Sequence, residues 1–161
     1  MAALACSLLL FSCKKEDRTV PIQLLLTDNP INLEEVNVDI QGLQVKINSD
    51  DAAWITLDAK EGVYNLLDYQ DGITTVMAQE EVPEGVLKEV RFILGTENTV
   101  KVDGEVYPLT TPSAEDSGLK VKIDKDLKET LNTFILDFDA ALSVREENGG
   151  YRLSPVIKLK E

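Results

Sequence analysis

FILDFDAALSV, residues 134–144, carries an apolar residue at every second position over the longest such stretch of the chain. The apolar positions are Phe134, Leu136, Phe138, Ala140, Leu142 and Val144. Successive side chains of a β-strand point to opposite faces, so this spacing places all six on one face. We therefore predict one long strand here, with its apolar face in the core of a β-structure.

Shorter runs of the same kind fill the rest of the chain between turn residues. The alternation of residues 36–40 restarts one position out of phase after Gln41-Gly42, which predicts a β-bulge there. Asp103-Gly104 and Asn148-Gly149-Gly150 are typical of hairpin turns. Together these features predict an all-β fold, a two-sheet antiparallel β-sandwich, with at most one short helical turn near residues 73–79.

The N-terminal segment has the pattern of a processed export signal. Ala2–Phe11 is apolar, too short to span a bilayer as a helix but suited to the core of a secretory signal. Ser12 before Cys13 resembles a bacterial lipobox, in which the cysteine is lipidated. Because signals normally open with Lys or Arg and residues 1–12 contain neither, we expect a truncated start. The predicted organisation is a signal peptide over 1–12, a lipidated tether over 13–19 and a single β-sandwich domain over 20–161.

Lys14-Lys15-Glu16-Asp17 directly follows the predicted lipidation site at Cys13. This charged tetrad resembles the export tag that sends lipoproteins of the Bacteroidota to the cell surface. We expect an outer membrane lipoprotein that faces outward, with a periplasm-facing position as the alternative. No second apolar segment is long enough for a membrane helix, so contact with the membrane is expected through the N-terminal lipid only.

Charge and composition restrict the chemistry. The formal net charge is −13 and the chain has no histidine. An acidic surface repels phosphate backbones, so nucleic-acid binding is not expected. Without histidine there is no Ser-His-Asp triad and no His-ligated zinc, and any metal must be a hard cation held by oxygens, which favours calcium. No cysteine follows Cys13, so the exported domain is expected to depend on its core rather than on disulfides.

Asp137 and Asp139 are the candidate metal ligands. They lie two residues apart on the predicted strand, on the face opposite the apolar stripe. Two carboxylates on one face can hold calcium with a third acid such as Asp28 or Asp39. Alternatively they belong to a solvated polar face, or they pair with arginines of neighbouring strands, Arg91 or Arg152.

The leading functional hypothesis is a non-catalytic binding or adhesion module at the cell surface, with a glycan or another surface protein as ligand. Loops carry binding better than sheet faces, so we expect the segment from Tyr69 to Gln79, with Tyr69 and Asp71 as contacts, and the loop from Pro112 to Ser117. A structural or accessory subunit of a surface assembly that uses an exposed edge strand is the alternative. A small hydrolase is a third and weaker hypothesis. The protein is expected to be a monomer.

Several segments, in the same order along the chain, resemble a bacterial lipoprotein family catalogued as domain of unknown function 4382. They are Tyr64-Asn65-Leu66-Leu67, Pro83-Glu84-Gly85 before Val90-Arg91-Phe92, Thr111-Pro112-Ser113 before Gly118-Leu119-Lys120, Leu136-Asp137-Phe138-Asp139-Ala140 before Ser143-Val144, and Tyr151-Arg152-Leu153-Ser154-Pro155-Val156-Ile157. The resemblance spans roughly residues 20 to 160. It implies a transthyretin-like or prealbumin-like β-sandwich and brings no established activity.

Overall fold

The computed structural model describes residues 18–29, 33–111 and 118–160. These residues form thirteen strands, one 3₁₀ helix (η1) and one short α-helix. Along the chain they are β1 Thr19–Thr27, β2 Glu35–Ile47, β3 Ile55–Leu57, β4 Gly62–Asn65, η1 Leu66–Tyr69, β5 Thr75–Pro83, β6 Val86–Leu94, β7 Thr99–Val102, β8 Glu105–Thr110, β9 Leu119–Asp126, β10 Asn132–Phe138, α1 Ala140–Ser143, β11 Val144–Glu147, β12 Gly150–Leu153 and β13 Ile157–Lys160.

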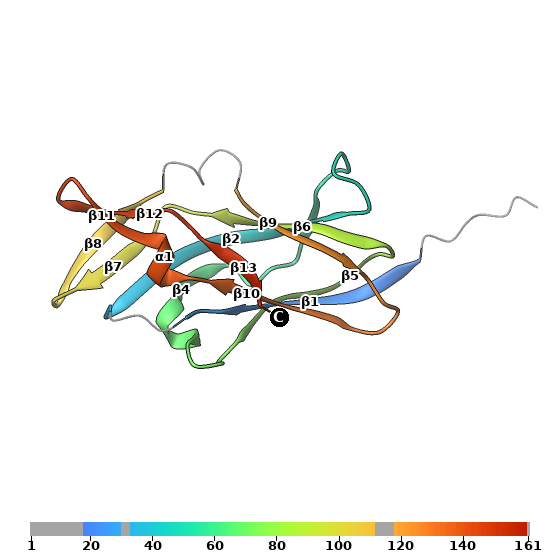
Figure 1. The fold of residues 1–161 in the computed structure, drawn as a ribbon, viewed down its shortest axis with the longest axis horizontal. Helices are drawn as coiled ribbons and strands as arrows, with labels where there is room; N and C mark the ends of the chain where they lie inside the picture. Colours follow the sequence, from blue (N-terminus) through green and yellow to red (C-terminus); the bar gives the residue numbers. More distant parts are fainter. Residues whose placement is uncertain (1–17, 30–32, 112–117, 161) are drawn as a thin grey trace, which may run out of the picture.

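The strands form two sheets, as the all-β sandwich prediction requires (Figure 1). The smaller sheet has the strand order β13-β10-β1-β5. The larger sheet has the order β11-β12-β8-β7-β2-β6-β9, and β3 and β4 pair in addition with the long strand β2. The C-terminal hairpin β11–β12 therefore lies at one end of the larger sheet and β9 lies at the other.

The sheets are mixed, which corrects the expectation of purely antiparallel pairing. β1 runs parallel to β10, with Leu24 opposite Phe134 and Leu26 opposite Leu136. β12 runs parallel to the end of β8. Parallel neighbours need a long connection between them, and here most of the chain lies between β1 and β10. Local alternation does not encode such distant pairing, so the strand direction had to come from the structure.

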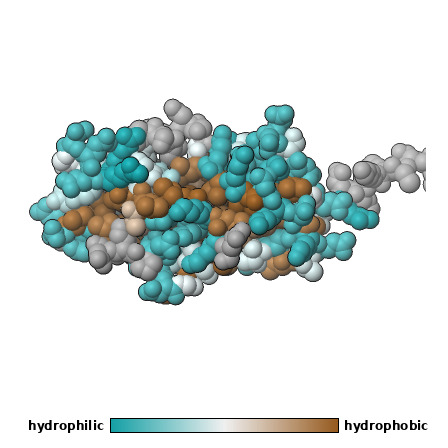
Figure 2. Space-filling view, in the orientation of Figure 1, coloured by the Kyte–Doolittle hydropathy of each residue, from teal (hydrophilic) through white to brown (hydrophobic). Residues whose placement is uncertain are grey.

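The core lies between the two sheets and is built from the alternating apolar positions. On β1, Val20, Ile22, Leu24 and Leu26 are all buried, and they face apolar residues of the larger sheet. The ring of Phe92 from β6 meets the ring of Phe138 from β10 edge-to-face, with centroids 6.3 Å apart. Figure 2 shows hydrophobic residues gathered in a band along the middle of one face, with hydrophilic residues above and below it.

The predicted bulge and hairpins are confirmed. The pairing of β2 with β6 shifts register between Ile40 and Gly42, where the sequence alternation slips. Asp103-Gly104 joins β7 to β8, and Asn148-Gly149 joins β11 to β12. All four turn residues have positive φ, between 50° and 80°, which is the backbone conformation that two-residue hairpin turns demand.

Two local predictions were wrong. Residues 75–83 form strand β5, and the helical turn near them is η1, where the Asn65 side chain accepts a hydrogen bond from the Leu67 amide. The alternation of residues 134–144 is not one strand, because the Asp139 side chain caps α1 and ends β10 at Phe138. No helix among the described residues is long and apolar enough to cross a membrane.

Candidate functional site

The two predicted metal ligands lie together at the end of β10. The Asn29 side-chain amide donates to Oδ2 of Asp137 at 2.7 Å and to Oδ2 of Asp139 at 3.4 Å. Oδ1 of Asp139 accepts from the Leu142 amide at 3.0 Å. Both aspartates are more than nine-tenths buried, with 7% and 6% of their surface exposed, so the alternative of a solvated polar face is wrong.

The neighbours proposed for these aspartates also need correction. Arg91 donates to Gln44, and Arg152 pairs with Glu147, so neither arginine meets Asp137 or Asp139. Of the two suggested third acids, Asp28 lies close enough for its charge to act on Asp137, whereas Asp39 accepts from the Glu97 amide in the other sheet. The nearest cation is Lys158, whose Nζ is 3.9 Å from Oδ2 of Asp139.

Asp28 connects this cluster to the predicted binding segment. Its Oδ1 accepts from the Ala140 amide at 2.8 Å, and its Oδ2 accepts from the Gln70 side chain at 3.1 Å. The carbonyl of Tyr69 accepts from the Asp28 amide at 3.0 Å. The two separately predicted sites, Asp137 with Asp139 and Tyr69 with Asp71, are therefore neighbours. Asn29 and Gln70, which join them, carried no sequence signal.

The charges of this cluster oppose one another. Burial raises the pKa of Asp137, and the neighbouring carboxylate of Asp139 raises it further. Burial also raises the pKa of Asp28. Oδ1 of Asp137 is buried without a hydrogen-bond partner among the described residues. Within the described part of the chain, no group of three or more His, Cys, Asp or Glu side chains is arranged to hold a metal ion. Calcium at Asp137 and Asp139 stays a prediction.

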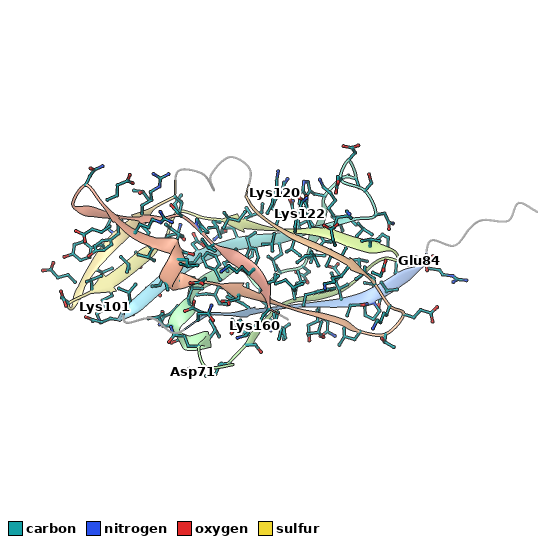
Figure 3. All side chains as sticks on the ribbon, viewed as in Figure 1. Asp71, Glu84, Lys101, Lys120, Lys122 and Lys160 are labelled. Atoms are coloured by element: carbon teal, nitrogen blue, oxygen red, sulfur yellow. The ribbon has the colours of Figure 1, made fainter. Side chains whose placement is uncertain are left out.

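The predicted binding contacts Tyr69 and Asp71 differ in exposure. The Tyr69 ring is half-buried against the core and lies 6.2 Å from the Tyr64 ring, centroid to centroid. Asp71 is exposed, with a positive φ of 55°, and Figure 3 shows it at the edge of the molecule beside η1. The far end of the predicted segment, Gln79, belongs to β5. Cys13 and residues 112–117 lie outside the described residues.

A more open site lies in the larger sheet, where β8 and β12 part. β8 pairs with β7 from Glu105 to Pro108, but it pairs with β12 only through Leu109 and Thr110. Beyond these two positions, the β12 side of β8 has no strand partner in the described chain. We call the opening between β8 and the β11–β12 hairpin the fork.

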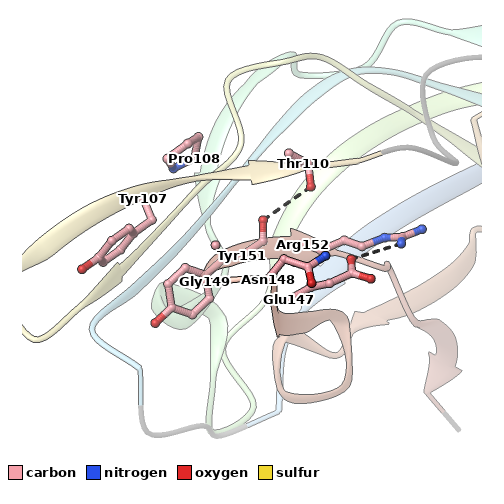
Figure 4. Close-up of a pocket in the computed structure, with 9 residues that line it drawn as sticks. Tyr107, Pro108, Thr110, Glu147, Asn148, Gly149, Tyr151 and Arg152 are labelled. Carbon is pink, nitrogen blue, oxygen red and sulfur yellow. Dashed lines mark hydrogen bonds and ion pairs between the residues drawn. The ribbon is translucent and has the colours of Figure 1, made fainter.

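The fork holds an open pocket of about 490 Å³ (Figure 4). Binding pockets for small ligands typically have volumes of about 300–1,000 Å³. Its lining residues are Tyr107, Pro108, Thr110, Glu147, Asn148, Gly149, Gly150, Tyr151 and Arg152. The rings of Tyr107 and Tyr151 lie 5.1 Å apart, centroid to centroid, and tilt by 53°. The pocket therefore offers a pair of aromatic rings beside polar groups.

The polar side of the fork comes from the hairpin. Nη1 of Arg152 lies 3.3 Å from Oε2 of Glu147, and Nε of Arg152 is buried with no hydrogen-bond partner in the described structure. The hydroxyl of Tyr107 donates to Oε2 of Glu105 at 2.6 Å, and this hydrogen bond raises the pKa of Tyr107. The fork thus combines an apolar surface with groups able to exchange hydrogen bonds with a ligand.

Sequence reasoning missed the fork. Tyr107 and Tyr151 are 44 positions apart, and each follows a turn that was correctly predicted. Only the parallel pairing of β8 with β12 brings them together, and no local pattern reports that pairing. Two tyrosines placed soon after hairpin turns were the available signal.

The sequence model of the family described as Domain of unknown function (DUF4382) matches residues 19–155. No curated protein and no solved structure matches the chain. The matched range runs from the first residue of β1 to beyond the end of β12, and so includes both the acidic cluster and the fork. The chain belongs to the DUF4382 family.

Proposed function

We propose that this protein is a non-catalytic binding module that holds a neutral oligosaccharide in the fork. The observation that carries the proposal is the tyrosine pair in the open pocket, with ring centroids 5.1 Å apart. Each ring presents an apolar face to the C–H groups of a sugar and a hydroxyl to its polar groups. The buried, unpaired Nε of Arg152 supports the proposal, because a ligand oxygen can accept its hydrogen bond.

Pro108 favours a sugar over a peptide strand in the fork. The Leu109 amide donates to the Asn98 carbonyl, toward β7, so the adjacent Pro108 nitrogen faces the fork. A proline nitrogen has no hydrogen to donate, and proline on an open edge opposes the addition of a strand. The fork side of β8 is therefore poorly suited to β-augmentation, the interaction on which the surface-assembly alternative rests.

The fork gives little support to the hydrolase alternative. Hydrolysis of a glycoside needs two carboxyl groups at a defined separation across the bond. Among the described residues that line the pocket, Glu147 is the one carboxylate, and it is paired with Arg152. The buried aspartates belong to the other sheet, under Asn29. Binding without catalysis is the function that this arrangement supports best.

We further propose that a lipid on Cys13 holds the module on the outer membrane, facing outward. The support is the apolar run before Cys13 and the charged tetrad after it. External protease should remove the protein from intact cells, and Cys13→Ala should release it from the membrane fraction. Protection until the cells are lysed would instead place it on the periplasmic side, and a membrane-bound Cys13→Ala protein would contradict the lipid anchor.

Calorimetric titration with a panel of neutral oligosaccharides tests the binding proposal. We expect a member of the panel to bind the wild-type protein, and Tyr107→Ala and Tyr151→Ala to lower its affinity about tenfold or more. Val106→Ala is the matched control, because Val106 lies on the same strand, is 62% exposed and does not line the pocket. Equal losses in all three variants, or no binding to the wild type, would contradict the proposal.

A further inference from the structure

The outer face of the larger sheet carries a group of cations on an otherwise acidic protein. Val45, Val90 and Val121 are buried neighbours on β2, β6 and β9, so the residues on either side of them point outward. We call this outward set the cationic face. Its charged members are Lys46, Glu89, Arg91, Lys120 and Lys122.

The balance of charge on this face is opposite to that of the chain. Four cations stand against one carboxylate there, whereas the whole chain has 16 Lys and Arg against 29 Asp and Glu. Lys120 and Lys122 are exposed and project from β9 on the same side of the molecule (Figure 3). An anionic group meets a locally favourable potential at this place despite the net charge.

Trp54 holds two of the cations in place. The guanidinium carbon of Arg91 lies 3.9 Å from the centroid of the Trp54 ring, and Nζ of Lys46 lies 4.7 Å from it. Nη1 of Arg91 also donates to the Gln44 side chain at 3.1 Å, while its Nε is buried with no hydrogen-bond partner among the described residues. Cations held in this way lose little conformational entropy when a ligand binds.

Acidic groups at the margins of the cationic face define the shape of its partner. Asp50 and Asp51 are exposed in the loop after β2, and Asp124 pairs with Lys88 at the other side. At physiological ionic strength, charges act over about 8 Å. A narrow chain lying over the cations escapes the surrounding acids, whereas a membrane plane or a nucleic-acid duplex extends over them. Gln44 and Thr56, in the same row as Arg91, offer an amide and a hydroxyl to a ligand rich in hydroxyl groups.

From these observations we infer that the cationic face binds an anionic polysaccharide, a linear chain that carries carboxylate or sulfate groups. The face lies on β2, β3, β6 and β9, and the fork lies on β8, β11 and β12. The two surfaces are therefore separate, and either proposal can fail without the other.

Trp54 is the only tryptophan of the chain, so its fluorescence reports directly on this face. The full-length protein is titrated with oligogalacturonate, with a sulfated dextran and with neutral dextran of similar length. We expect an anionic polymer to change the Trp54 emission in a saturable way that weakens as salt is added, and neutral dextran to have no effect. A response to neutral dextran, or no response to either anionic polymer, would overturn the inference.

The double variant Lys120→Gln/Lys122→Gln should weaken binding of the anionic polymer about tenfold. Lys60→Gln/Lys128→Gln removes two exposed lysines elsewhere and should leave the affinity unchanged, which separates a local site from an effect of net charge. Poly-glutamate and anionic phospholipid vesicles complete the set of probes. Tighter binding of either, or equal loss in the two double variants, would overturn the polysaccharide assignment.

Discussion

Tyr107 and Tyr151 approach to 5.1 Å between ring centroids although they come from strands that share only two paired positions. Tyr64 and Tyr69 form a second pair at 6.2 Å, beside the acidic cluster. All four tyrosines of the chain are therefore in contact pairs, one in the fork and one next to the segment predicted from the sequence. This distribution makes the two candidate sites directly comparable in one experiment.

Phe138→Ala should destabilise the protein by about 3–5 kcal/mol, because it removes a fully buried ring and leaves a cavity between the sheets. Phe138 packs edge-to-face on Phe92 of the opposite sheet and has no exposed surface. Leu142→Ala serves as the control, since Leu142 is 47% exposed. Chemical denaturation measures both, and similar losses would contradict the packing described for this interface.

Asp137→Asn should stabilise the protein at neutral pH by about 1 kcal/mol, which raises the melting temperature by about 2–4 °C. Burial and the charge of Asp139 raise the pKa of Asp137 above the ordinary value of 3.8, so its ionised form costs stability in the folded state. The amide keeps an oxygen to accept from Asn29 and removes the charge. Thermal melts at neutral pH, in buffer without calcium, measure the change.

The sign of the pH dependence follows from the same raised pKa. Between pH 3.8 and the higher folded-state pKa, the native protein holds more protons at Asp137 than the unfolded chain does. The cost of the ionised group is full above that range and is relieved as the pH falls through it. The advantage of Asp137→Asn should therefore shrink toward acid pH, and an advantage that grows on acidification would contradict this explanation.

Asp28→Asn should have the opposite effect and destabilise the protein by about 1–3 kcal/mol. Both carboxylate oxygens of Asp28 accept hydrogen bonds, from the Ala140 amide and from the Gln70 side chain. An asparagine supplies only one acceptor. Rotation of the Gln70 amide cannot compensate, because the same Gln70 nitrogen also donates to the Asn29 carbonyl. Unchanged stability in denaturant titrations would show that these hydrogen bonds matter little.

Calcium at Asp137 and Asp139 is checked by melting the protein in calcium and in EDTA. Binding requires Asn29 to rotate, because its amide nitrogen now donates to both carboxylates. If calcium binds there, the melting temperature rises with calcium concentration, and Asp137→Asn abolishes the rise. Equal melting temperatures in the two buffers would remove calcium from the description of this cluster.

The strands and turns were predictable because their signals are local. Apolar alternation gave β1 and β2, a slip of phase gave the bulge near Gly42, and Asp103-Gly104 gave a hairpin. The alternation at 134–144 misled because Asp139, followed by Ala140 and Ala141, is also a helix-capping sequence, and the capping hydrogen bond to Leu142 prevailed. Side-chain contacts between distant strands, such as those of the fork and the acidic cluster, depend on sheet order, which these local patterns do not contain.

Tyrosine-selective isotope labelling followed by NMR titration tests the binding site most directly. With only four tyrosines, signals assigned through single Tyr→Phe variants separate the Tyr107–Tyr151 pair from the Tyr64–Tyr69 pair. We predict that a neutral oligosaccharide shifts the ring signals of Tyr107 and Tyr151 in a saturable way and leaves those of Tyr64 and Tyr69 in place. Shifts confined to Tyr64 and Tyr69 would contradict binding in the fork and return the site to the Tyr69–Asp71 segment.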